Sequence, residues 1–473
     1  MVEEPQLPPV AEMLRWIEDV VAQGIRRPGY PADRWAEDFV HRAFGSLGLE
    51  AVRFEPVESA YWIDRRGALT VVGDQSAEAI DCFSVPLSEP SLVEGQLARW
   101  DPADPSAVAG KIALYELHFG ALPDEFPVLR RRAAGDGPSS SPAALAEAGW
   151  AFDPDGTFSE GRHRLPFATE VQETMEPAIS AGAIGYVGVL RGYPSGGCEY
   201  YVPYDGRFRS IPGVYVSESS GDRLLAFLES GPANATVEVV AERGVTASRN
   251  VVGELPGADD EWVIVGTHHD GPWASAVEDG TGIAMLLAQA TAWAAVPQSE
   301  RPHRLIFVAT AAHMSHAAGT RAFIERHRAI MDRVVLELHL EHAALDSPPE
   351  GESFDVANKR VTPRWWFTTE IPRLEATVWA AIVKHHLDRS LVLTPDALAP
   401  FPTTDGGFFH LEGVPLVNYL TAPWYLFDSA DTLDKVDASS LSKVSKAAFD
   451  IVRATAGTSA EQMRSSRAAV KSQ

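Results

Sequence analysis

Residues 246–473 repeat one pattern, in which an apolar run of strand length is followed by a loop and then by a helix. The runs "EWVIVGTH", "HRLIFVATAA" and "VVLELHLE" are apolar enough to be buried on both faces. Helical patterns such as "GTGIAMLLAQATAWAAV" and "TRAFIERHRAIM" stand between them. Strands that alternate with helices form parallel sheets covered on both sides. The pattern therefore predicts an α/β sandwich with a mostly parallel central sheet.

Residues 57–245 have a different texture, with short strand-like runs and frequent turns. Examples are "GKIALYEL", "AGAIGYVGVL" and "IPGVYVSESSG", and a loop rich in Gly, Ser and Pro, "RRRAAGDGPSSSPAA", interrupts them. Short strands with closely spaced turn signals are typical of β-rich domains. We therefore expect an inserted β-rich domain over residues 57–245. Residues 1–56 and 246–473 then form the two parts of one α/β domain.

The charge of the chain limits its partners. Forty basic and 65 acidic residues give a formal net charge of −25. Nucleic acids and anionic membranes are bound by clustered Lys and Arg, so neither is an expected partner. The first residues lack the basic and apolar regions of a secretion signal, and there is no long apolar run for a membrane span. We therefore expect a cytoplasmic protein.

Histidines and carboxylates gather where the predicted strands end. The three clusters are "THHD", "AAHMSH" and "LHLEHA", and "ASAVEDGTG" lies between the first two. Ligands of such sheets bind at the carboxyl ends of the strands. Imidazole and carboxylate groups that converge there are suitable ligands for a divalent metal ion. Histidines that fill the core and satisfy their own hydrogen bonds remain an alternative.

Several longer stretches resemble the M28 metallopeptidase family. "SRNVVGELPGADDEWVIVGTHHDG" is similar to the stretch that leads into the family's H-x-D motif, and "FPTTDGGFFHLEGVPLVNYL" and "DSADTLDKVD" are similar to its closing segments. The short strands between residues 57 and 245 resemble a protease-associated domain. This combination is that of the branch with glutamate carboxypeptidase II and the transferrin receptor. The resemblance implies a three-layer sandwich with a mixed, mostly parallel sheet and an inserted protease-associated domain.

The resemblance also implies metal ligands. In the family, one zinc ion is held by the His of H-x-D and by two Asp residues. These positions fall on His268, Glu278 and Glu341. Asp270 matches the aspartate that orients the histidine ligand and fixes its tautomer. We therefore expect one divalent ion at this place, with zinc as the first choice and iron or manganese as alternatives.

The positions that bind the family's second ion have changed. They fall on Met314 and Phe427, whose thioether and phenyl groups cannot hold zinc against water. We therefore expect the second ion to be absent. His313 stands where the family has its carboxylate base, and we expect it to take up the proton. An imidazole with a pKa of about 6.5 suits this task at neutral pH.

Other residues near the strand ends are additional candidates for ligation or substrate contact, namely His269, His316, His342, Trp273 and Tyr425. The imidazoles allow a second interpretation, in which one site is rebuilt from two or three histidines and a carboxylate. Alternation along "LELHLEH" puts Glu341 and His342 on opposite faces, so both can bind one ion only where the strand has already ended.

These expectations describe a metal-dependent hydrolase that cleaves an amide or other C–N bond with one divalent ion and a histidine base. The expected substrate is a small, partly aromatic molecule, and a homodimer is an open alternative to a monomer. A metal-dependent lyase on the same fold is one alternative function. The other is an inactive binding or scaffold protein, because the transferrin receptor keeps this fold without catalytic metals.

Overall fold

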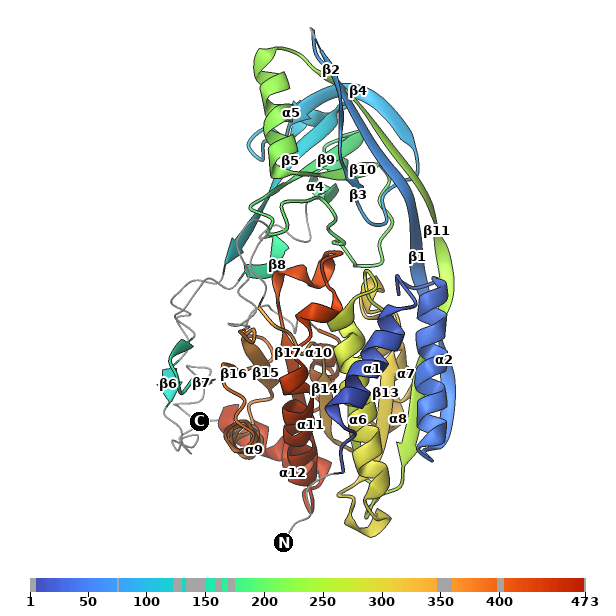
Figure 1. Cartoon of the computed structure of the whole chain (residues 1–473), viewed down its shortest axis with the longest axis vertical. Helices are drawn as coiled ribbons and strands as arrows, with labels where there is room; N and C mark the ends of the chain where they lie inside the picture. Colours follow the sequence, from blue (N-terminus) through green and yellow to red (C-terminus); the bar gives the residue numbers. More distant parts are fainter. Residues whose placement is uncertain are drawn as a thin grey trace.

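The chain folds into two lobes joined by a long two-stranded ribbon (Figure 1). The computed structural model describes residues 6–74, 76–121, 130–132, 150–157, 164–168, 175–346, 360–397 and 404–471. The large lobe contains both ends of the described chain and the strands predicted after residue 246. The small lobe is built from most of the strands and helices of residues 77–230.

A mixed sheet forms the centre of the large lobe. Its strands follow one another in the order β1 (Glu50–Val72), β11 (Asn234–Leu255), β13 (Arg304–Thr310), β12 (Trp262–His268), β14 (Val334–Leu340), β17 (Leu416–Thr421), β15 (Arg364–Thr368), β16 (Ser390–Leu393), β7 (Trp150–Phe152) and β6 (Arg130–Arg132). The four strands β13, β12, β14 and β17 are parallel. The predicted α/β fold with a mixed, mostly parallel sheet is confirmed.

Helices cover both faces of this sheet. One face carries α1 (Val10–Val21), α2 (Pro31–Ser46), α6 (Gly282–Ala295), α9 (Pro372–Lys384) and α11 (Ala438–Arg453). The other face carries α7 (Ala318–Arg326), α8 (Arg328–Met331) and α10 (Gly406–Leu411). The last helix, α12 (Ala460–Lys471), lies where β14 and β17 begin, because Arg464 donates to the carbonyls of Met331 and Gly413.

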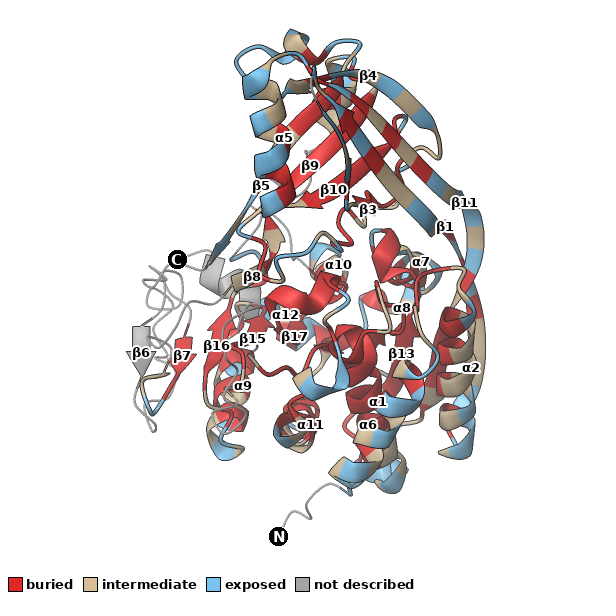
Figure 2. Ribbon diagram, turned by 45° about the horizontal axis from the view of Figure 1, so that its top comes forward, coloured by how far each residue is buried: buried red, intermediate tan, exposed pale blue. Residues whose placement is uncertain are grey.

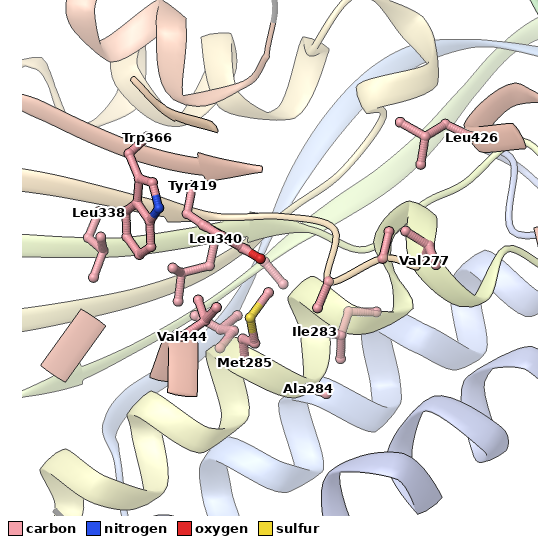
Figure 3. Packing of buried hydrophobic residues seen from close by; sticks show 14 of the residues in the cluster. Val277, Ile283, Ala284, Met285, Leu338, Leu340, Trp366, Tyr419, Leu426 and Val444 are labelled. Atoms are coloured by element: carbon pink, nitrogen blue, oxygen red, sulfur yellow. The ribbon is translucent and has the colours of Figure 1, made fainter. Parts of the chain in front are cut away.

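Helix α6 is apolar on nearly all sides because it lies between the sheet and the outer helices. Its residues Ile283 and Met285 pack in one cluster with Leu338 and Leu340 of β14 and with Val444 of α11 (Figure 3). Strands β12, β14 and β17 in the middle of the sheet are buried along their length, whereas α1 and α2 turn one side to solvent (Figure 2). This packing fixes the carboxyl ends of the central strands, where the predicted site lies.

The small lobe has its own sheet, in the order β3 (Phe83–Ser84), β10 (Gly213–Ser217), β9 (Gly185–Arg191), β5 (Ile112–Ala121) and β4 (Leu92–Arg99). Strand β2 (Ala77–Ile80) pairs with β1, and β8 (Arg164–Ala168) pairs with β5. Two helices, α4 (Met175–Ser180) and α5 (Glu218–Ser230), complete it. Among the described helices of the chain, none has the length and apolar composition of a membrane-spanning segment.

The lobes are not divided where the change in texture placed the boundaries. Residues 57 and 245 lie inside β1 and β11, which pair without interruption from Phe54 opposite Val251 to Asp64 opposite Ala241. Strand β7, which falls within residues 57–245, pairs with β16 at the edge of the central sheet. Composition marks the turn-rich part of the chain but cannot show that a strand continues through the boundary.

We predict that Leu338→Ala destabilises the large lobe strongly. Leu338 is fully buried in the centre of the sheet, and a buried Leu→Ala change costs about 2–5 kcal/mol of unfolding free energy. Chemical denaturation followed by fluorescence measures this loss. The matched control is Leu433→Ala, because Leu433 is 41% exposed. Equal effects of the two substitutions would contradict the assignment of this core.

Candidate metal centre

Three histidine side chains and one glutamate converge at the carboxyl edge of the central sheet. His268 is the last residue of β12, and His313 follows β13 at the start of a short turn, η5 (His313–Ser315). His342 comes two residues after β14. Glu278 lies in the distorted turn η3 (Ala276–Thr281), which precedes α6. Because β12, β13 and β14 are parallel neighbours, their ends bring the three imidazoles together.

The distances show how closely these groups meet. Nε2 of His268 lies 3.5 Å and Nε2 of His313 lies 3.7 Å from Oε1 of Glu278. Nε2 of His342 lies 2.5 Å from Oε2 of the same carboxylate. The rings of His268 and His313 stack with centroids 4.1 Å apart. His268, Glu278 and His313 each offer a ligand atom within 4.8 Å of the others.

The other ring nitrogen of each histidine is held by an oxygen. Nδ1 of His268 lies 2.9 Å from the carbonyl of Asp270, and Nδ1 of His342 lies 2.8 Å from the carbonyl of Thr421. A carbonyl only accepts, so both Nδ1 atoms carry the proton. Nδ1 of His313 lies 2.8 Å from Oδ1 of Asp405. In the neutral ring, each Nε2 is therefore left with its lone pair facing Glu278.

These facing atoms are buried and lack ordinary partners. Nε2 of His268, Nε2 of His342 and both carboxylate oxygens of Glu278 have no partner with hydrogen-bond geometry among the described residues. Burial acts to lower the pKa of His342, yet the adjacent Glu278 raises it to about 10, so the imidazolium compensates this buried carboxylate. A divalent ion that displaces the proton would supply the positive charge in its place. Three imidazole nitrogens and one carboxylate are a ligand set that divalent zinc, iron or manganese accepts. The residues present therefore fit such an ion.

Asp405 supports His313 from behind. Its second oxygen accepts hydrogen bonds from the hydroxyls of Thr310 and Thr320, at 2.8 and 2.9 Å. Burial acts to raise the pKa of Asp405, but the adjacent His313 outweighs it and holds that pKa below its usual range. Burial acts to lower the pKa of His313, yet its pair with Asp405 raises it to about 10. A metal ion bound at Nε2 must therefore displace a proton from this imidazole.

Buried aspartates hold the backbone of each segment that carries a candidate ligand. The carboxylate of Asp270 accepts the N–H groups of His313 and Met314, both at 2.9 Å. Asp431 accepts the N–H groups of Val277 and Glu278, also at 2.9 Å. Burial raises the pKa of Asp270 to about 6 and that of Asp431 to about 7. The positions of the candidate ligands thus depend on two carboxylates, those of Asp270 and Asp431, that are not candidate ligands themselves.

Asp279 has the same role for the third segment. Its Oδ1 accepts the N–H of Gly282 at 2.9 Å and the N–H of His342 at 3.2 Å. Its Oδ2 accepts a hydrogen bond from Thr267, next to His268. Asp279 therefore ties the start of α6 to the ends of β12 and β14.

A buried arginine holds the loop between His268 and Glu278. The Arg26 side chain donates to the carbonyls of His269, Ala274, Ser275 and Glu278, and it is fully buried. Burial lowers the pKa of Arg26, although nearby carboxylates oppose this effect. No pattern in the sequence indicated this role, because "RRPG" between two helices is typical of an exposed turn.

Asp270 and Glu341 are placed differently from the prediction. Asp270 does orient the imidazole of His268, but through its main-chain carbonyl, while Oδ1 is 3.8 Å from that Nδ1. Oε1 of Glu341 lies 3.1 Å from Nε2 of His339, and Nδ1 of that histidine lies 2.9 Å from Glu337. The three side chains follow one face of the strand, as alternation predicts. The closest described imidazole to Glu341 is thus His339, outside the converging group.

The imidazole of His342, and not the carboxylate of Glu341, lies against Glu278. Strand β14 ends at Leu340, and His342 has a left-handed backbone with φ of 46°. The alternation of the strand no longer applies at this point, so the imidazole turns toward Glu278. The sequence-based condition that the strand must already have ended is therefore met.

The remaining candidates lie outside the group. His269 pairs with Asp33 at 3.2 Å and anchors α2, and His316 is exposed. The hydroxyl of Tyr425 donates to the carbonyl of Leu345 at 2.7 Å within the core. The indole of Trp273 donates to the carbonyl of Phe427 at 3.2 Å. Each of these four side chains thus has a structural contact or an exposed position instead.

Aromatic side chains occupy the side of His313 that faces away from His268. The ring of Tyr204, from the small lobe, stacks on His313 with centroids 5.3 Å apart. The other face of Tyr204 stacks on Phe427 at 4.9 Å. Met314 and Phe427, at the positions that the resemblance gave to a second ion, are both buried.

Comparison with known proteins identifies the class. Residues 250–452 match the sequence model of peptidase family M28, and this stretch contains His268, Glu278, His313 and His342. No curated protein matches the chain. The M28-type segment and the fold together class the protein as a metal-dependent hydrolase.

Three solved structures show the same fold over nearly the whole chain. An aminopeptidase from Aneurinibacillus sp. strain AM-1 is 18% identical, with 94% of this chain and 93% of that chain covered and a TM-score of 0.62. A peptidase M28 precursor from Shewanella amazonensis SB2B is 19% identical, with the same coverage and a TM-score of 0.66. BSAP, a zinc aminopeptidase from Bacillus subtilis, is 15% identical, with 94% and 95% covered and a TM-score of 0.62.

We predict that Asp405→Asn weakens metal binding without unfolding the protein. The amide cannot supply the negative charge that holds Nδ1 of His313, and loss of such a support costs about 10–100-fold in metal affinity. Competition with a chromogenic zinc chelator measures the affinity. Asp450→Asn is the control, because Asp450 forms ion pairs on α11 with Lys384 and Arg453. An unchanged affinity in Asp405→Asn would contradict the support role.

Proposed function

We propose that the protein hydrolyses an amide or other C–N bond in a small molecule, with one divalent ion held by His268, Glu278, His313 and His342. The observation that carries the proposal is the convergence of three imidazole Nε2 atoms on one buried carboxylate. Each ring is fixed by an oxygen at Nδ1, which is how proteins orient histidine ligands. The class of the family and of the fold supports hydrolysis.

The proposal assigns one ion, with zinc as the first choice. Zinc is supported by the zinc aminopeptidase among the similar folds, and three nitrogens with one carboxylate also suit iron or manganese. A second ion lacks ligands at Met314 and Phe427, whose side chains offer a thioether and a phenyl ring. The aromatic stack on His313 further fills the space beside it.

An ion at this place supplies a Lewis acid that polarises a carbonyl and lowers the pKa of water. The residues of the chain do the rest. Glu278 contributes negative charge, Asp405 fixes the ring of His313, and the burial of all four ligands excludes bulk water. In this proposal Nε2 of His313 binds the ion, so the sequence-based expectation of a free base at this residue is replaced by a ligand role.

The same histidine favours a second candidate function, a metal-dependent lyase. In the M28 family that the chain resembles, a carboxylate base stands at the position of His313, which in this proposal binds the ion. A lyase breaks its bond by elimination and needs no activated water. Incorporation of oxygen from labelled water into the product supports hydrolysis, and its absence supports the lyase.

We predict that substitution of each proposed histidine ligand lowers the metal content. Wild-type protein should hold about one ion per chain, and His268→Ala, His313→Ala and His342→Ala should each lose most of it, because each removes one of the three imidazoles of the proposed site. Elemental analysis of the purified proteins measures the content. His316→Ala is the matched control, because His316 lies near the group but is exposed.

The same set of proteins separates the alternatives. If His313→Ala keeps its ion, His313 is not a ligand. It then acts as a base or only packs in the core. If Glu341→Gln loses the ion while His342→Ala keeps it, the ligand set expected from the family is correct. A metal-free wild type supports the inactive scaffold.

We predict that removal of the ion lowers the thermal stability. A ligand present at about 1,000 times its Kd stabilises the folded state by about 4 kcal/mol. Treatment with a chelator should therefore lower Tm, and added zinc should restore it. In His342→Ala, zinc at the same concentration should have little effect. An equal rise of Tm in both proteins would show that zinc binds elsewhere.

A further inference from the structure

The small lobe reaches the candidate metal centre through one short loop. Residues 204–206 of this loop lie against η5, the turn that begins with His313. The N–H of His316 donates to the carbonyl of Tyr204 at 2.9 Å. A Cβ on Gly206 would lie 2.7 Å from the hydroxyl of Ser315, so the two backbones approach closely. Asp205 fixes the loop through a bidentate pair with the buried Arg209, both contacts at 2.7 Å.

A groove borders this contact between the loop and η5. It has a volume of about 490 Å³ and is lined by Asp205, Gly206 and Phe208 of the loop and by Ser315, His316 and Arg321 of the large lobe. The loop and η5 therefore line one part of this groove, and neither Tyr204 nor His313 is among its lining residues.

Tyr204 fills a slot between two flat side chains. Its ring is inclined by 24° to the imidazole of His313 and by 17° to the ring of Phe427. Both of its faces are thus covered, and both neighbours are buried. Tyr204 itself is partly exposed, unlike the two rings that enclose it. Nearly parallel rings at such distances attract one another and accept a flat group between them.

We propose that Tyr204 is a gate beside the metal centre, and that a planar ring of the substrate takes its place between His313 and Phe427. The inference rests on the proposed function and narrows its substrate to molecules whose reacting group is attached to a flat ring. Tyr204 is then the residue that sets specificity. The small lobe contributes it, which gives that lobe a direct part in substrate selection.

The binding of two amides tests the gate. Benzamide and cyclohexanecarboxamide carry the same amide group on a flat and on a puckered ring. In Tyr204→Ala the slot is open, so benzamide should bind at least about tenfold more tightly than to wild type, since stacking contributes only to a flat ring. Cyclohexanecarboxamide should gain little. Isothermal titration of zinc-loaded protein measures both affinities.

Two variants complete the test. Tyr204→Phe keeps the ring and should bind benzamide as wild type does. Phe427→Leu in the Tyr204→Ala protein removes one flat wall and should abolish the preference for benzamide. An equal gain for both amides, or no gain for benzamide, overturns the proposal.

Failure of this inference is distinguishable from failure of the proposed function. Zinc content is measured on every sample used for titration. Zinc-free wild type would refute the proposed function, while the ring preference can still be read because stacking between His313 and Phe427 needs no ion. Zinc-loaded protein without ring preference refutes the gate alone.

Discussion

The hydrogen bonds at three Nδ1 atoms decide where the free nitrogen of each imidazole points. Two of the acceptors are main-chain carbonyls, at Asp270 and Thr421, and the third is the carboxylate of Asp405. Because these oxygens belong to the ends of strands or to neighbouring turns, the rings are oriented by the same sheet that carries them. Each Nε2 then faces Glu278, which is the arrangement that the proposed metal site requires.

The electrostatics of the centre favour a cation at this point. Glu278 lies among the buried Asp270, Asp279 and Asp431, and the buried Arg26 is one cation near them. His313 and His342, whose pKa values neighbouring carboxylates raise to about 10, are two more. Burial raises the pKa of these aspartates, which measures the cost of keeping so many carboxylates away from water. A divalent ion lowers that cost. The backbone contacts of the three aspartates also mean that such an ion would stabilise the turns that bear its ligands.

Much of the arrangement could be predicted from the sequence, because the end of a buried parallel strand is a position that a pattern can locate. The strand-end pattern placed His268 and His313 at one edge of the sheet, and the family resemblance added Glu278, which the structure brings close to both. Whether Glu341 or His342 points toward Glu278 depends on the residue at which β14 ends. A sequence pattern does not fix the end of a strand to a single residue. Asp405 and Arg26 could not be found, because neither stands in a periodic segment and each acts through contacts distant along the chain. The same limit explains why β7 was not assigned to the central sheet.

In the proposed one-ion centre, an aromatic stack lies beside His313 where a two-ion peptidase would hold its second ion. A phenyl ring and a thioether occupy the positions where the resemblance places further ligands, and the small lobe adds Tyr204 against His313. X-ray absorption at the zinc edge of the loaded protein tests the central claim most directly. The account predicts one zinc ion with a first shell of nitrogen and oxygen, in which scattering from three imidazoles is resolved. A second metal at about 3.5–4 Å, the spacing of two-ion sites, or a shell with a single imidazole would contradict it.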